Sequence, residues 1–377
     1  MTGAALACSV AQSHSQEIAA KSKDSAPPDW TIGVTFVDEL VGQGVPVLSI
    51  DRPDWPNYLS KQPGTAKAWR SLKAEVAAAN PAGWRVAALT RSEAWLRGSP
   101  DAVTIAALDA TNSDPAIAGN FKILASSQNW QGEGVKLGTP WSTLSESGQW
   151  QWQIDAEFMR LRQLRTNALS GDLQYQGSGV YDFDLNSQRS SKSITSPFLA
   201  ASGSYGLGVT MSVAVQGRPA AGWHIRLRAD DVMSRLQWSN LATETSTLNS
   251  QVTSRAPDGS LDYAPLLQGQ NALTDVNRRI GAHWQAHIAW APFESTGRAG
   301  SVTYRVSRKA GINQNWVGWG SGGGTPSALR WKFEVEPVRS AVQLGLTWGG
   351  WQAIAASDGK GLATEYRKFH VGWTNSF

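Results

Sequence analysis

The last eleven residues of the chain, Arg367 to Phe377, place the strongest constraint on its fold. They read R-K-F-H-V-G-W-T-N-S-F. Phe369, Val371, Trp373 and Phe377 share one parity, with Asn375 as the only polar exception, while Lys368, His370, Gly372, Thr374 and Ser376 share the other. Because successive side chains of a strand point to opposite faces, the segment is predicted to be a terminal strand with one apolar aromatic face and one polar face.

A terminal strand that ends on an aromatic residue, with apolar residues two apart before it, resembles the C-terminal assembly signal of bacterial outer-membrane β-barrel proteins. The resemblance implies that the β-barrel assembly machinery reads Phe369, Val371, Trp373 and Phe377. It also implies that the last strand pairs with the first and closes a barrel. Asn375 departs from the apolar preference of this signal. A terminal strand of a soluble β-sandwich is the alternative interpretation of the same residues.

Alternating segments recur along most of the chain, and the clearest is a hairpin from Tyr205 to Ala229. Its first strand carries aliphatic side chains on one face and glycine or small polar residues on the other. Lipid outside a barrel and water inside it require this pattern, although a sandwich with the faces reversed would also produce it. Strands of about ten residues favour the membrane, because soluble strands average about five or six.

Tryptophan is unusually frequent, with 19 Trp against 7 Tyr and 9 Phe. Indole rings favour sites that are partly dry and partly wet, such as the two interfaces of a bilayer. A soluble protein that stacks its rings on sugars would also be rich in Trp. The residues here are spread over many strand-like segments, which favours aromatic girdles around a barrel.

Composition excludes several other classes of protein. Mean hydropathy is -0.30, and no run of about 18 apolar residues could cross a bilayer as a helix. A net charge of +4 without a basic stripe argues against nucleic acid as a partner. Cys8 is the only cysteine, so the rest of the chain can form neither a disulfide nor a thiolate metal site. We expect no cofactor and no metal.

We expect one barrel domain over residues 31–377, preceded by two short segments. Residues 1–16 resemble the end of a secretory signal peptide, with Ala5-Leu6-Ala7 as a cleavage site, and residues 17–30 are polar and predicted to be a disordered linker. Within the barrel, residues 65–80 show helical spacing and are predicted to be one short helix. Residues 102–109 are a candidate strand, and residues 241–275 are predicted to be one long loop.

No motif for catalysis stands out, and we expect no enzyme. On a helix, His283 and His287 would share one face and could bind one metal ion. Their segment is predicted to be a strand, in which a spacing of four residues separates them by about 13 Å, too far for one zinc ion. Lining of a lumen is the better interpretation of both. The residues predicted to line it are Arg226, Arg228, His283, His287, Arg305, Lys332, Glu334, Glu336 and Lys368. In an open barrel they would border a hydrated passage, whereas facing rows of opposite charge would cross-link and close it.

The sequence therefore predicts an all-β protein, a transmembrane antiparallel β-barrel of about 12 to 14 strands, in the outer membrane of a Gram-negative bacterium. We expect a channel or transporter for small polar or amphipathic solutes, in contact with outer-membrane lipid. One alternative is a closed barrel that serves as a structural or assembly partner in an envelope or secretion complex. The other is a soluble, Trp-rich protein that binds glycans.

Overall fold

The computed structural model describes residues 30–47, 64–144, 149–195, 205–250, 252–255, 261–263, 267–291, 300–321 and 328–376. Residues 1–29 lie outside this part, and with them the predicted signal segment and almost all of the predicted linker. Phe377, the last residue of the predicted assembly signal, is outside it as well.

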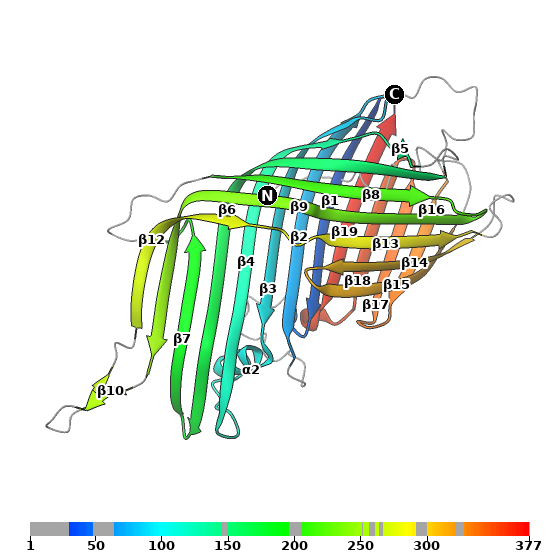
Figure 1. Cartoon of the computed structure of the whole chain (residues 1–377). Helices are drawn as coiled ribbons and strands as arrows, with labels where there is room; N and C mark the ends of the chain where they lie inside the picture. Colours follow the sequence, from blue (N-terminus) through cyan, green and yellow to red (C-terminus); the bar gives the residue numbers. More distant parts are fainter. Residues whose placement is uncertain are drawn as a thin grey trace, which may run out of the picture.

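Fourteen strands of the described chain form one closed antiparallel barrel (Figure 1). In order around the ring they are β1 (Thr31–Gln43), β2 (Ala66–Ala79), β3 (Arg85–Gly98), β4 (Gly119–Gly138), β6 (Trp150–Gly177), β8 (Gly206–Gly217), β9 (Trp223–Asn249), β13 (His283–Trp290), β14 (Gly300–Lys309), β15 (Ile312–Ser321), β16 (Arg330–Glu336), β17 (Ala341–Trp348), β18 (Trp351–Ser357) and β19 (Tyr366–Ser376). The predicted fold class and strand number are confirmed.

The last strand closes the ring against the first. β19 pairs with β1 over its whole length, from Thr31 opposite Ser376 to Val41 opposite Tyr366. No edge is left in the ring, so the polar backbone of every strand has partners on both sides. The soluble sandwich considered above is therefore wrong, because its two sheets would each keep open edges.

One predicted element is wrong in type. Residues 66–79, within the segment predicted to be a helix, form strand β2, which pairs with β3 from Ala66 opposite Gly98 to Ala79 opposite Arg85. Its alanines and charged residues favour helix locally, but two neighbouring strands override that propensity. The side chains alternate, with Lys73 and Glu75 toward the lumen and Val76 exposed on the outer wall.

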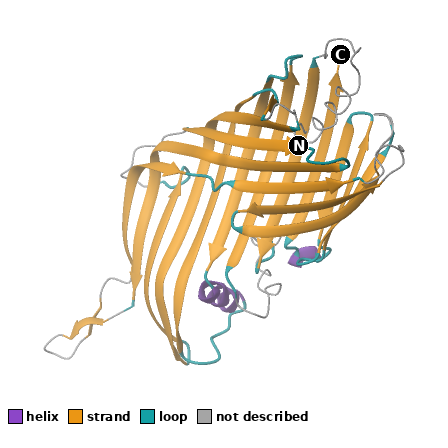
Figure 2. Cartoon of the chain, turned by 45° about the vertical axis from the view of Figure 1, so that its right-hand side comes forward, coloured by secondary structure: helices purple, strands orange, loops and turns teal. Residues whose placement is uncertain are grey.

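The α-helix of the described chain is α2 (Pro100–Ala110), within which residues 102–109 had been predicted to be a strand. Ser99 caps it by accepting a hydrogen bond of 3.2 Å from the backbone N–H of Ala102, and Pro100 follows the cap. Proline in the first turn after a serine cap is a strong signal for a helix start. α2 lies between β3 and β4 at the barrel end opposite the C-terminal end of β19 (Figure 2). Among the described residues, no helix combines the length and apolar character that crossing a bilayer needs.

The wall is much taller on one side, because β4, β6 and β9 run far beyond the ring and are joined there by β7 (Val180–Ser191) and β12 (Leu267–Arg278) (Figure 1). We call this extension the lip. The predicted loop over residues 241–275 is therefore partly wrong. Residues 241–249 and 267–275 are lip strands, and β10 (Val252–Arg255) pairs with β11 (Leu261–Tyr263) between them. Beyond Thr243 the side chains on both faces of these strands are exposed or partly buried, so neither face has to be apolar and the sequence alternates poorly.

β7 and β8 both pair with β6 on the same edge, and β12 and β13 both pair with β9. β7 and β8 are therefore two parts of one interrupted strand, and so are β12 and β13. The interruption between β12 and β13 is Arg279 to Ala282, where Ser234 donates a hydrogen bond to the carbonyl of Ile280 and accepts one from its N–H. β5 (Ser142–Thr143) adds a short pairing to β6, and the 3-10 turn η3 (Gly361–Ala363) precedes β19.

Candidate functional site: the lumen

The alternation of the strands decides which side chains face the lumen. In the hairpin β8–β9, Leu207 and Val209 are exposed on the outer wall, whereas Thr210 and Ser212 of the other parity are buried. Of the residues predicted to line the lumen, His283, Arg305, Glu334 and Glu336 are buried. The others, Arg226, Arg228, His287, Lys332 and Lys368, are partly buried.

A first network of ion pairs joins β2, β3, β4, β6 and β9. Arg91 donates to Glu157 at 3.0 Å and to both carboxylate oxygens of Asp231 at 2.8 and 2.5 Å, and it also pairs with Glu93 at 2.5 Å. Lys73 binds Glu157 as well. The guanidinium of Arg91 therefore ties three walls of the barrel together. Burying these charges is tolerable only because each has a partner of opposite sign.

The same network continues toward the end of the barrel that holds the C-terminal end of β19. Asp155 accepts from Arg85 at 2.7 Å and lies 3.7 Å from Arg228, while Lys136 donates to both oxygens of Glu75 at 3.1 Å. Of the predicted lumen residues, Arg228 belongs to this network. Arg226 lies nearby with its guanidinium 5.8 Å from the centre of the Trp141 ring.

A second network joins β1, β14, β16 and β19. Glu39 binds Lys309, lies 3.5 Å from Lys368 and accepts from the Tyr366 hydroxyl at 3.4 Å. Glu334 pairs with Arg305 at 3.0 Å and with Lys332 at 2.9 Å. Lys332 also lies 3.0 Å from Nε2 of His287. Glu336 pairs with Arg339 of the β16–β17 turn at 3.5 Å.

Contacts of this kind cross the lumen. The shorter way round the ring from β14 to β1 passes five strands, β15 to β19, so Lys309 and Glu39 come from nearly opposite walls. Trp69 on β2 and His283 on β13 are separated by β3, β4, β6, β8 and β9, yet their rings meet edge to face with centroids 5.0 Å apart. In the described part of the chain, side chains from distant walls thus cross-link the lumen at these levels.

Apolar side chains fill the lumen between and beyond the charges. One group lies toward the lip, and Arg91 of the first network sits over its Trp130 ring at 5.4 Å. Its members are Leu89, Trp130, Met159, Leu161, Leu164, Leu236, Trp238, Leu241, Val276 and Ile280. A second group surrounds Trp69, Trp316 and Tyr366. Tight packing of these rings leaves little space for water in this part of the barrel.

A cavity of about 300 Å³ opens at the end of the barrel opposite the C-terminal end of β19. It is lined by Arg97, Gly281, Ala282, Trp284, Arg308, Ala310 and Gly311, and we call it the mouth pocket. Among the described residues, neither Arg97 nor Arg308 pairs with a carboxylate; Arg97 lies over the Trp95 ring at 5.5 Å. The pocket therefore offers two uncompensated guanidinium groups beside one indole ring.

The outer wall has the opposite character. Val302, Phe333 and Leu344 are between 42% and 49% exposed, as bulky apolar residues of a soluble surface seldom are in such numbers. Exposed Trp residues form a belt at the end that holds the C-terminal end of β19: Trp84, Trp223, Trp290, Trp319, Trp331, Trp348 and Trp351. Several touch across strands, for example Trp319 and Trp331 with ring centroids 5.5 Å apart.

A closed ring of strands with an apolar outer wall, a Trp belt and a polar lumen satisfies the requirements of a bilayer. The protein is a transmembrane β-barrel of the bacterial outer membrane. The longest connections, 44–65, 99–118 and 250–266, leave the end opposite the Trp belt. Since outer-membrane barrels carry their longer loops outside the cell, we assign the lip and the mouth pocket to the extracellular side.

Comparison with known proteins finds no matching family model and no matching curated protein. Solved structures with a similar fold include a deletion mutant of TodX, titled a monoaromatic hydrocarbon channel, at 8% identity and TM-score 0.42, covering 93% of this chain and 91% of that one. CymD, also titled a monoaromatic hydrocarbon channel, has 9% identity, TM-score 0.35 and coverage of 100% and 95%. The toluene transporter TbuX of Ralstonia pickettii has 7% identity, TM-score 0.33 and coverage of 93% and 90%. All three superpositions are loose.

Several residues that cross-link the lumen are not among those predicted from the sequence. Glu39, Lys73, Arg91 and Glu93 were not singled out, although Arg91 and Glu93 continue the inward parity of Ala87 and Leu89 in β3. Asp231 breaks the alternation of β9, because its φ of 56° belongs to a bulge where the pairing with β8 shifts between Met211 and Val213. The sequence signal for Asp231 is an acidic residue that interrupts a regular alternation, which is typical of a bulge.

Proposed function

We propose that the protein is a gated passage of the outer membrane for small amphipathic solutes, anionic ones above all. The observation that supports this proposal is the position of the mouth pocket at the end of β14, the strand that carries Lys309. Arg308 and Ala310 line the pocket and flank Lys309 in the sequence. Because successive side chains of a strand point to opposite faces, Lys309 turns toward Glu39 in the lumen, and a molecule in the pocket lies across the end of this one strand from the ion pair.

The chemistry of the pocket favours a small molecule with an acidic group and an apolar body. Arg97 and Arg308 present planar guanidinium groups, which bind carboxylates by paired hydrogen bonds. Trp284, which is 41% exposed, adds an apolar face. A cavity of about 300 Å³ is at the lower end of the range for small-molecule sites. A compound of the size of benzoate fits these properties.

An anion in the pocket would also weaken the closure. Lys309 binds Glu39 and lies 5.2 Å from the centre of the Trp69 ring. Negative charge bound at Arg308 attracts the same ammonium group across the end of β14 and competes with Glu39 for it. Loss of the Lys309–Glu39 contact removes one link between β14 and β1, which is the step that we assign to opening.

Flux through proteoliposomes tests the proposal. Vesicles loaded with benzoate or with glucose, a neutral polar probe, are compared for the wild type, R97Q/R308Q and E39Q/K309Q. We expect the wild type to release benzoate faster than glucose, R97Q/R308Q to lose at least tenfold of the benzoate rate, and E39Q/K309Q to pass both probes. The control R189Q/E244Q removes a pair of 2.7 Å on the lip, far from the lumen, and should behave as the wild type.

A closed barrel that acts as a structural or assembly partner is the second candidate. The cross-linked lumen favours it, because a permanently closed barrel needs no route for a solute. If the folded wild type releases neither probe and E39Q/K309Q releases neither, the passage is wrong and this second function takes its place.

A further inference from the structure

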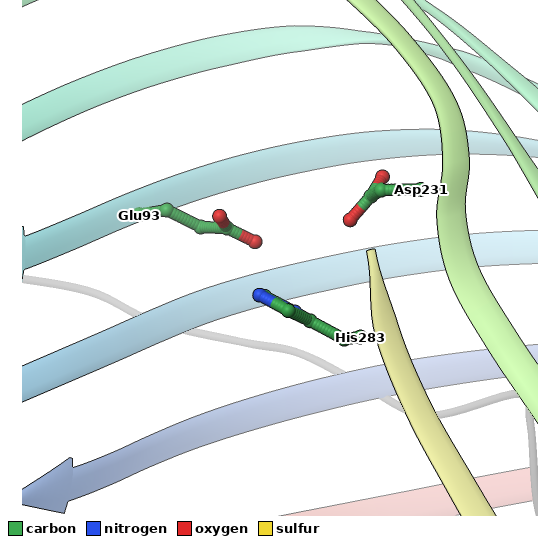
Figure 3. A group of neighbouring side chains, drawn as sticks. All are labelled: Glu93, Asp231 and His283. Carbon is green, nitrogen blue, oxygen red and sulfur yellow. The ribbon is translucent and has the colours of Figure 1, made fainter. Parts of the chain in front are cut away.

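A group of three potential metal ligands lies in the lumen, where three strands meet. Glu93 comes from β3, Asp231 from β9 and His283 from the first position of β13, and their side chains point toward one another (Figure 3). One ligand atom from each lies within 4.8 Å of the other two. The residues are 3%, 2% and 8% exposed, so bulk water hardly reaches them.

His283 is the residue that points to a missing ligand. It is more than nine-tenths buried, and neither ring nitrogen makes a hydrogen bond with a described residue. Its ring is held edge-on against Trp69, at centroids 5.0 Å apart and an interplanar angle of 86°, which turns the imidazole toward the two carboxylates. A buried imidazole without a partner is costly, and a cation bound to a ring nitrogen would satisfy it.

The charge balance at this point also leaves room for a cation. Glu93 and Asp231 both pair with Arg91, and no other cationic side chain of the described chain pairs with either. Arg91 is shared further with Glu157. Glu157 has Lys73 as a second partner, so the deficit falls on Glu93 and Asp231. Two carboxylates on one shared guanidinium leave about one negative charge beside the imidazole.

The position of Asp231 is fixed by the backbone. It adopts a φ of 56° in a bulge of β9 and donates its N–H to the Ser212 hydroxyl at 3.3 Å. The interruption from Arg279 to Ala282 then lets β13 begin beside it, opposite Asp230. The three ligands are thus held by strand pairing and not by a mobile loop.

We propose that Glu93, Asp231 and His283 bind a divalent transition-metal ion, with Zn²⁺ as the probe. One imidazole and two carboxylates suit first-row metals, whereas Mg²⁺ and Ca²⁺ prefer oxygen ligands alone. Ligand bonds of about 2.0–2.2 Å require the three atoms to approach one another by about 1 Å, which side-chain rotation allows. Arg91 donates to both oxygens of Asp231 and to one of Glu93. Each carboxylate oxygen has a second lone pair, so Arg91 would stay bound and orient the carboxylates toward the ion. The bound ion would link β3 to β9 and β13 across the lumen.

Metal binding to the purified barrel tests the proposal. The protein, prepared without a polyhistidine tag and stripped with chelator, is titrated with Zn²⁺ by calorimetry and with Co²⁺ by visible absorption. We expect one equivalent to bind, and the temperature at which the heat-modifiable band unfolds to rise by several degrees. H283Q should lose the Co²⁺ absorption and at least tenfold in affinity, and E93Q should do the same.

His287 provides the matched control. It lies four residues further along β13 with the same inward parity, but it already contacts Lys332. H287Q should therefore bind metal as the wild type does. The proposal is overturned if the folded wild type binds less than 0.1 equivalent, an order-of-magnitude threshold for incidental binding, or if H283Q binds as tightly as the wild type. Because H283Q removes no ion pair, it should keep the heat-modifiable folded form.

Discussion

Removal of the negative charge of Glu39 should destabilise the barrel strongly. Glu39 is 3% exposed and contacts two ammonium groups, those of Lys309 and Lys368. At the 3.5 Å that separates Lys368 from Glu39, with an effective dielectric constant of about 20, one such attraction is about 5 kcal/mol before desolvation is subtracted. Since E39Q leaves both cations in the lumen without a carboxylate, we expect a net loss of about 3–5 kcal/mol.

The measurement is the free energy of unfolding in urea, with the barrel in phospholipid vesicles and the folded fraction read from its heat-modifiable mobility. E39Q, K309M and E39Q/K309M form a double-mutant cycle. The double variant should be more stable than E39Q alone, because it removes one of the two stranded cations, with a coupling energy of at least about 1.5 kcal/mol.

Glu244 provides the control for this prediction. It pairs with Arg189 at 2.7 Å on the lip, where the arginine side chain is 56% exposed, so E244Q should cost no more than about 1 kcal/mol. A loss below about 1 kcal/mol in E39Q as well would refute the reasoning. Water would then reach Glu39, and the lumen would not be closed at that level.

Three further predictions address the wall, the lip and assembly. L344R places a charge on the outer wall at a residue that is 48% exposed, and it should lower the free energy of unfolding by about 2–4 kcal/mol in the same urea assay. The control L344M should lower it by less than about 1.5 kcal/mol. Equal losses would mean that lipid does not cover this strand. On the lip, the Tyr181 hydroxyl donates to Asp114 at 2.7 Å, which raises the pKa of Tyr181 to about 12. The hydrogen bond between Tyr181 and Asp114 is therefore complete below pH 10 and is lost as the pH rises toward 12. Protease cleavage near residue 114 should increase over that pH range in the wild type and should not depend on pH in Y181F. Deletion of Phe377 should reduce the folded band in cell membranes without changing the urea midpoint of protein refolded in vitro, whereas equal folded amounts in cells would contradict the predicted assembly signal.

Much of the fold could be predicted because the bilayer imposes a simple rule on each strand. The hairpin around Gly217 alternates so regularly that its two faces could be assigned to lipid and lumen, and the structure places them so. The rule fails where the bilayer ends. The lip strands beyond residue 243 have water on both faces. For a different reason the rule also misses β2, whose alanine, lysine and glutamate have a local preference for helix.

The lumen could be predicted only as a set of inward residues and not as pairs. Parity within a strand identifies Arg305 and Glu334 as inward, but their contact depends on the register of β14, β15 and β16 together. The pair of Lys309 and Glu39 depends on the closure of the whole ring, 270 residues apart in sequence. Local sequence holds no signal for either pairing. The inward position of Asp231 also depends on a bulge in β9, and the sequence of β9 alone does not reveal that bulge.

The two kinds of contact in the lumen differ in what it costs to separate them. Opening an apolar contact exposes hydrocarbon to water at about 25 cal/mol for each Å². Opening an ion pair returns two charges to water, whose hydration nearly offsets the lost attraction. Lys309 and Glu39 join distant walls by an ion pair, whereas the apolar group around Leu161 and Trp238 spans one side of the ring, from β3 to β9. A second apolar group, around Trp69 and Trp316, crosses the lumen beside that ion pair. Because separating the ion pair costs little once both charges are hydrated, the apolar group beside it would set most of the free energy that opening of the proposed passage needs.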